Sequence, residues 1–136
     1  MPVNLLLGEP LSAREAQQKN PLVLAFIGDS LWDLLVRGQL LHSSAKVNTL
    51  HRQAIGRVNA GAQAEVYQQI LPHLTPEETD IARRGVNAHA RHNTPKNQNP
   101  LAYSQSTGLE ALFGYLYLSG QGDRILELFD IGAKMP

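Results

Sequence analysis

Two apolar stretches decide the fold of this chain: PLVLAFIGDSLWDLLVR at residues 21–37 and LAYSQSTGLEALFGYLYL at residues 101–118. Apolar residues recur at three- and four-residue spacing from Leu24 to Leu41, which is typical of a long helix with one face in a core. An Asn-Pro pair opens each stretch, and Asn at the N-cap followed by Pro is a common helix start. We therefore expect two long, apolar helices here.

Helix signals also cover the rest of the chain. Ser12 with Glu15 matches a capping box, and TPEE at 75–78 combines an N-cap, a first-turn Pro and a capping-box Glu. Capping residues and apolar spacing predict further helices at about 13–19, 47–57, 60–71, 76–88 and 123–129. The Asn- and Pro-rich segment 91–100 is expected to be a loop. No segment alternates like a strand, so the sequence predicts an all-α fold of about six or seven helices.

Length and composition are those of one ordinary globular domain. The 136 residues suit a single domain spanning 1–136, in which 1–20 form an N-terminal extension with a short helix. A hydrophobic fraction of 43% excludes disorder, and the absence of Cys excludes disulfides, thiolate metal sites and cysteine nucleophiles. No apolar run approaches the roughly 18 residues of a membrane span, and no signal peptide is evident. We expect a soluble, cytoplasmic protein without a membrane partner.

Two windows of the chain contain no acidic residue, although the formal net charge is +0. One window lies between Asp33 and Glu65, and the other lies between Asp80 and Glu110. Together they hold eight of the 12 basic residues: Arg37, Lys46, Arg52, Arg57, Arg83, Arg84, Arg91 and Lys96. This clustering favours two surfaces that meet a polyanion such as a nucleic acid. Ordinary solvated helix faces would produce the same pattern.

Three carboxylates lie inside the two apolar stretches: Asp29, Asp33 and Glu110. A carboxylate in an apolar setting is costly unless it is paired or bound to a cation. Gly28 and Gly108 lie beside two of these acids, and such residues permit two helices to cross closely. A divalent cation would relieve the repulsion between acids brought together in this way, and all-oxygen ligands suit Mg²⁺ or Mn²⁺ rather than Zn²⁺. The alternative is that each acid pairs with an Arg or caps a helix.

Five segments of the chain, taken in order, carry a family resemblance: FIGDSLWDLLVR (26–37), VNAGAQAEV (58–66), RRGVNAHA (83–90), TPKN (94–97) and STGLEALFGYLYL (106–118). Together they resemble the ribonuclease III domain, whose two catalytic helices match the first and last segments. More specifically, they resemble Mini-ribonuclease III, the bacterial form without a double-stranded-RNA-binding domain. The resemblance runs from residue 21 to the last helix and implies a homodimeric ribonuclease III-type endonuclease domain.

The resemblance implies roles for four residues. Asp29 and Glu110 match the Mg²⁺-binding catalytic acids of the family. Glu65 matches a further acid and is a possible metal ligand, although an exposed helical Glu is the alternative. Phe26 matches an aromatic residue that inserts into the partner subunit at the dimer interface, with core packing as its alternative.

The chain departs from full-length ribonuclease III at three positions where that enzyme has acids: Leu22, Ala25 and Thr107. Mini-ribonuclease III shares these losses, which supports the narrower resemblance. Fewer protein oxygens remain to hold a second ion. We therefore expect one firmly held Mg²⁺ in each site, with water and the scissile phosphate completing its coordination shell.

The predicted RNA contacts are polar and basic, as the phosphates and 2′-hydroxyls of A-form RNA require. The loop at 91–99 has this composition, and family position adds residues on the preceding helix. The predicted contacts are Arg83, Arg84, Asn87, Arg91, Lys96 and Asn97. For each of them the alternative is an ordinary solvated surface residue.

The function implied by the resemblance is Mg²⁺-dependent endonucleolytic cleavage of double-stranded RNA. The ion would polarise the scissile phosphate and lower the pKa of an attacking water. The family also implies maturation of the large-subunit ribosomal RNA precursor by a homodimer, with a ribosomal protein as a possible further partner. The alternative is a non-catalytic, dimeric RNA-binding or ribosome-assembly module on the same fold.

Overall fold

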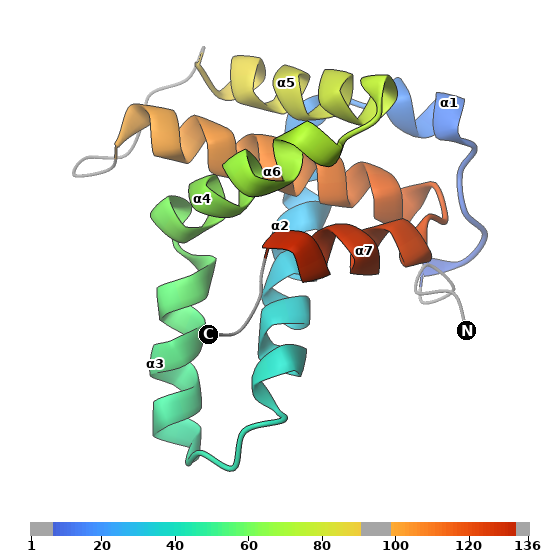
Figure 1. Cartoon of the computed structure of the whole chain (residues 1–136). Helices are drawn as coiled ribbons and strands as arrows, with labels where there is room; N and C mark the ends of the chain where they lie inside the picture. Colours follow the sequence, from blue (N-terminus) through green and yellow to red (C-terminus); the bar gives the residue numbers. More distant parts are fainter. Residues whose placement is uncertain (1–6, 91–98, 133–136) are drawn as a thin grey trace.

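The computed structural model of the chain describes residues 7–90 and 99–132, which form seven α-helices and one short 3-10 turn (Figure 1). In chain order these are α1 (Ala13–Gln17), α2 (Pro21–Leu40), α3 (Val47–Val58), α4 (Ala60–Ile70), η2 (Leu71–His73), α5 (Pro76–Ala90), α6 (Pro100–Leu118) and α7 (Gly122–Gly132). Neither described range contains a strand, so the predicted all-α fold is confirmed. None of the described helices is long and apolar enough to cross a membrane.

The helix starts follow the capping residues that the sequence indicates. The side chains of Asn20, Asn59 and Asn99 each accept a hydrogen bond from a backbone N–H of the helix that follows, at 2.8–3.0 Å. The reciprocal capping box predicted at the start of α1 is also present. Gly120 follows the C-cap of α6 with a φ of 77°, a conformation that favours glycine. Local sequence therefore sets most of the helix boundaries.

The helix α6 is the centre of the fold. It is apolar nearly all round, and α2, α4, α5 and α7 pack around it (Figure 1). Trp32 of α2 lies edge-on to Phe113 of α6 and to Phe129 of α7, with ring centroids 5.2 Å apart in each pair. This aromatic group joins the three helices in one buried core.

Two glycines let α2 and α6 cross in backbone contact. A Cβ at Gly28 would lie 1.7 Å from the carbonyl oxygen of Glu110, and a Cβ at Gly114 would lie 1.9 Å from that of Leu24. Any larger side chain would push the helices apart, because the atoms in the way belong to backbone. The crossing therefore places the residue after Gly28, which is Asp29, beside Glu110.

The helix α5 approaches α6 through a second pair of glycines. A Cβ at Gly85 would lie 2.9 Å from the Cα of Gly108, and a Cβ at Gly108 would lie 2.7 Å from the carbonyl oxygen of Ala82. The close helix approach predicted at Gly108 is therefore present, and its neighbour is α5. Gly28 and Gly114 make the crossing that carries the two acids.

Arg124 of α7 ties the start of α5 to the rest of the fold. Its guanidinium donates two hydrogen bonds of 2.9 Å to the buried carboxylate of Glu78 and one of 2.8 Å to the carbonyl of His73. Burial alone would raise the pKa of Glu78, but the hydrogen bonds from Arg124 and Thr75 outweigh it and lower that pKa. Glu78 is therefore a structural carboxylate, separate from the acids of α2 and α6.

Candidate active site

Asp29 and Glu110 meet where α2 crosses α6. Asp29 raises the pKa of Glu110 in two ways, by accepting a hydrogen bond from the protonated Glu110 carboxyl group and by its own negative charge. The structure therefore brings together the two acids that the sequence selected. Neither acid has an Arg partner among the described ion pairs, which removes the simple pairing alternative for this pair.

The pKa of Glu110 is raised to about 8 in this environment. Burial is the largest cause, and the hydrogen bond and charge of Asp29 raise the pKa further, while a hydrogen bond from Gln63 lowers it. Two carboxylates this close do not both ionise readily without a cation. The pair therefore holds a proton at neutral pH when no metal is present. Binding of a metal ion would release this proton, because a carboxylate binds a metal in its ionised form.

The donors at this site fit Mg²⁺ or Mn²⁺. They are two carboxylates and a neighbouring amide, all of them oxygen-bearing groups, with no thiolate and no described imidazole beside them. Within residues 7–90 and 99–132, no cluster of three or more His, Cys, Asp or Glu residues is present. Mg²⁺ characteristically uses one or two carboxylates and keeps water or phosphate in its other positions. Asp29 is exposed, so the site is open to solvent and to a polymeric substrate.

The positions that lack the additional family acids offer no replacement ligand. Ala25 is buried, and the hydroxyl of Thr107 is also buried and donates to the carbonyl of Tyr103 at 3.1 Å. Leu22 contributes only an apolar side chain. This geometry supports the expectation of one ion held by two carboxylates rather than a protein cage for two ions.

Gln63 of α4 is a site residue that the sequence reasoning missed. Its Nε2 donates to Oε2 of Glu110 at 3.5 Å, and its side chain is only 3% exposed. A signal was present, because Gln63 begins the buried stripe of α4 that continues with Val66, Tyr67 and Ile70. An amide in an otherwise apolar stripe needs a polar partner, and here the partner is Glu110.

Glu65 does not join the acid pair. It lies on the exposed side of α4, two residues from Gln63, and two residues turn a helix by about 200°. Gln63 and Glu65 therefore face opposite ways, so the predicted further ligand is replaced at the site by an amide. Asp33 is also separate, since it pairs with Arg37 one turn later at 3.0 Å on the protein surface.

Phe26 is 76% exposed on the outer face of α2. Its alternative assignment to the core is therefore wrong for the single chain. Val23, Leu34 and Leu41 are also exposed, and intervals of three, eight and seven residues place them with Phe26 near one side of α2 and its C-cap. Such an apolar face suits a protein interface, and the dimer contact predicted for Phe26 stays a prediction.

The predicted RNA-binding residues fall into three groups. Arg83 and Asn87 are exposed and lie one turn apart on the same face of α5. Arg84 instead donates to the carbonyls of Gln17 and Lys19 at 2.7 and 3.3 Å, where α1 ends. The remaining predicted contacts, Arg91, Lys96 and Asn97, lie outside the described residues, as does the loop segment 91–98.

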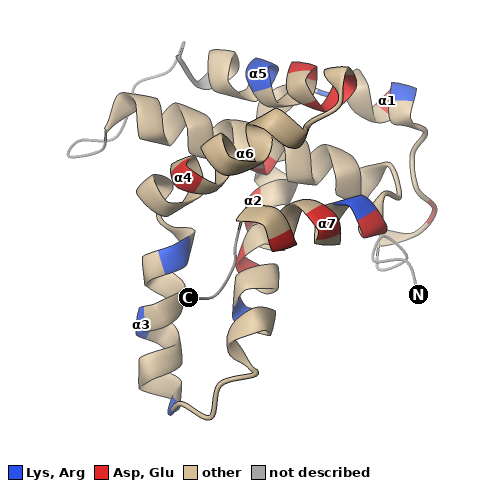
Figure 2. Cartoon of the chain, in the orientation of Figure 1, with Lys and Arg blue, Asp and Glu red and all other residues tan. Residues whose placement is uncertain are grey.

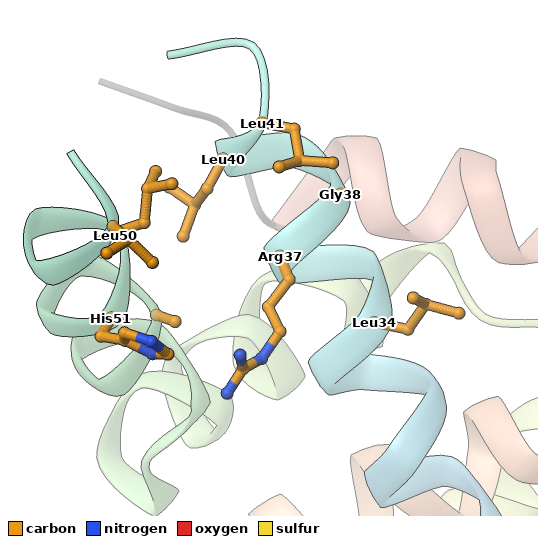
Figure 3. Close-up of a pocket in the computed structure, with 9 residues that line it drawn as sticks. Leu34, Arg37, Gly38, Leu40, Leu41, Leu50 and His51 are labelled. Atoms are coloured by element: carbon orange, nitrogen blue, oxygen red, sulfur yellow. The ribbon is translucent and has the colours of Figure 1, made fainter. Parts of the chain in front are cut away.

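Charge is separated over the described helices. Figure 2 shows only basic charged residues on α3 and both signs of charge on α2, whereas α7 is mainly acidic. A cavity of about 280 Å³ lies between α2 and α3, and it is lined mainly by leucines together with Arg37 and His51 (Figure 3). In Figure 3 the Arg37 side chain extends from α2 toward α3. Neither Asp29 nor Glu110 lines this cavity, so it is distinct from the acid pair.

The chain is similar to known proteins over most of its length. The Ribonuclease III domain family matches residues 22–121, which include both acids. The Mini-ribonuclease 3 of Symbiobacterium thermophilum is 46% identical over 114 residues, covering 83% of this chain and 87% of that protein. The Mini-ribonuclease 3 of Desulfitobacterium hafniense is 43% identical over 118 residues, covering 86% and 74%. A crystal structure of a Fusobacterium nucleatum protein superposes with a TM-score of 0.76 at 30% identity, covering 84% of this chain and 91% of that one. This chain therefore belongs to the ribonuclease III family, in its Mini-ribonuclease 3 group, and is an endoribonuclease of that type.

Proposed function

We propose that the chain is a Mg²⁺-dependent endoribonuclease that cleaves double-stranded RNA at the Asp29–Glu110 pair. The observation that carries this proposal is the contact between these two carboxyl groups at the α2–α6 crossing. Nothing in the packing of the core requires two acids there, and their mutual repulsion costs stability. A site retained at such a cost is consistent with a functional role.

Asp29 and Glu110 would hold the ion directly through their carboxylate oxygens. When bound, Mg²⁺ supplies charge that stabilises the transition state on the phosphate and favours ionisation of the attacking water. The chain's own contribution is positional. Glu110 of α6 is partly buried against Gln63 of α4. Asp29 is exposed, so a phosphodiester can approach it from solvent.

Duplex RNA would contact basic and polar side chains from the two windows of the sequence that contain no acidic residue. Arg83 and Asn87 share a helix face on α5, and Arg52 adds an exposed positive charge on α3. Arg91, Lys96 and Asn97, which lie outside the described residues, belong to the same proposed contact set. The guanidinium of Arg84 already donates to two backbone carbonyls at the end of α1. A phosphate contact by Arg84 would use the same guanidinium.

A homodimer would cut both strands of the duplex. The exposed apolar face of α2 around Phe26 supports this assembly, since a partner would cover side chains that are costly to leave in water. In the family-based proposal, the substrate is a precursor of large-subunit ribosomal RNA, and a ribosomal protein assists its presentation.

One experiment tests this function directly. The purified chain is incubated with a short RNA duplex, or with precursor ribosomal RNA, in the presence of Mg²⁺ or EDTA, and the cut ends are mapped. Cleavage only with the metal supports the proposal. Tight binding of both RNAs without any cleavage would instead favour the non-catalytic RNA-binding module.

A further inference from the structure

Gln63 lies in an environment that an amide side chain would not occupy without a partner. It is 3% exposed and shares the buried stripe of α4 with Val66, Tyr67 and Ile70. Leaving such an amide unpaired in an apolar setting is destabilising. The partner that the fold supplies is Oε2 of Glu110, at 3.5 Å from Nε2.

The packing of α4 on α6 sets the position of this amide. Gln68, five residues after Gln63, donates to Gln105, five residues before Glu110, at 2.9 Å. Between these two contacts, Tyr67 packs against Gly108 so closely that a Cβ there would lie 3.2 Å from the ring. These contacts fix the position of α4 along α6, and that position places the Gln63 side chain beside Glu110.

We infer that Gln63 is a positioning residue for metal binding, which sets the orientation of the Glu110 carboxylate toward Asp29 and the ion. The inference rests on the proposed metal-dependent function and adds a residue from a third helix to its site. A carboxylate whose Oε2 accepts from a buried amide is less free to rotate than one that lacks this partner. Groups that orient a metal ligand in this way characteristically change metal affinity when they are removed.

A purely structural role for Gln63 makes a different prediction. In that case the amide only satisfies buried polarity between α4 and α6, and its removal changes the free energy of unfolding without changing the metal affinity of the folded protein. The decisive quantity is therefore Mg²⁺ affinity, measured beside stability in EDTA.

The test uses Gln63→Met, which keeps the side-chain length and removes the donor, with Gln69→Met on the exposed side of α4 as a matched control. Isothermal titration with Mg²⁺, repeated with Mn²⁺ by electron paramagnetic resonance, gives the affinity. Urea unfolding in EDTA gives the stability. We expect the Kd for Mg²⁺ to rise about 10- to 100-fold in Gln63→Met and to stay unchanged in Gln69→Met. Excess Mg²⁺ should restore most of the lost cleavage.

A second measurement needs no variant, in case Gln63→Met folds poorly. In the wild-type protein, the side-chain amide resonances of Gln63 should shift when Mg²⁺ is added, while those of Gln69 should not. Equal Mg²⁺ affinity in the wild type and Gln63→Met, or unmoved Gln63 amide resonances on Mg²⁺ binding, would overturn the inference alone. A wild-type protein that neither binds Mg²⁺ nor cleaves RNA would overturn the proposed function itself.

Discussion

The Cα of Gly28 on α2 lies against the backbone carbonyl of Glu110 on α6, with no room for a Cβ between them. This contact explains how two acids from distant parts of the chain meet in an apolar crossing. Helices that touch through backbone bring the residues beside the contact within reach of each other, and here those residues carry the carboxylates.

The first prediction concerns this contact. Gly28→Ala should destabilise the fold by about 3 kcal/mol or more, because its Cβ would collide with backbone and force α2 away from α6. Gly38→Ala is the matched control on the same helix, since nothing lies within 4 Å of a Cβ there. That control should be neutral or stabilising by up to about 1 kcal/mol. Urea unfolding of both variants measures the difference, and equal effects would contradict the crossing.

Much of the fold was predictable because its signals are local. The Asn caps of α2, α4 and α6 act within three residues of their helices, and apolar spacing reveals which elements are helical. The acid pair was also predictable, since the two apolar stretches hold only three carboxylates and the family resemblance selects Asp29 and Glu110 among them.

The parts that sequence reasoning missed depend on helix register. Gln63 was overlooked and Glu65 was preferred, although the two differ by half a helical turn and only the packing of α4 on α6 decides which one faces Glu110. The same limit applies to Gly108, which could have faced α2 or α5 until the crossings were known. Composition and spacing along one helix do not define its rotation about its axis relative to a neighbour.

The second prediction concerns catalysis. Asp29→Asn and Glu110→Gln should each lower kcat by about a thousandfold or more, because loss of a metal ligand removes several kcal/mol of transition-state stabilisation. RNA binding, measured by fluorescence anisotropy, should change little. Asp33→Asn is the control, since Asp33 pairs with Arg37 at the surface and should retain nearly full activity. Substantial cleavage by either of the first two variants would remove that acid from the active site.

The third prediction concerns the pH dependence of stability in EDTA. The pKa of Glu110 rises from 4.5 to about 8 on folding. Between these values the folded state retains a proton that the unfolded state has lost, so the free energy of unfolding falls as the pH rises and levels off above about 8. The expected loss is a few kcal/mol, at about 1.4 kcal/mol per pKa unit.

Glu110→Gln provides the control for this titration. It removes the group, so its stability should stay nearly flat over the same pH range and exceed that of the wild type near pH 8. Saturating Mg²⁺ should restore much of the wild-type stability at high pH, because the ion binds the ionised pair. Parallel pH curves for the wild type and Glu110→Gln would contradict the raised pKa.

The fourth prediction concerns assembly. Phe26→Ser should yield a monomer by sedimentation equilibrium, whereas the wild type should show twice the chain mass. Because Phe26 is exposed in the single chain, its replacement should leave the far-ultraviolet circular dichroism and the helical content unchanged. Ile55→Ser, at another exposed apolar residue on α3, is the matched control and should remain dimeric. A monomeric wild type would exclude the proposed cut across both strands.

The fifth prediction concerns RNA contacts and distinguishes charges that bind RNA from charges that stabilise the fold. Arg83→Ala and Lys96→Ala should each weaken duplex binding and reduce the slope of log K against log salt by about 1, because each removes one phosphate contact. Arg84→Ala should instead lower the free energy of unfolding, because it releases the carbonyls of Gln17 and Lys19 at the end of α1. The salt titration and the urea unfolding of all three variants therefore separate binding charges from structural ones. An unchanged salt slope in Arg83→Ala would place its charge outside the RNA footprint, whatever its effect on affinity at one salt concentration.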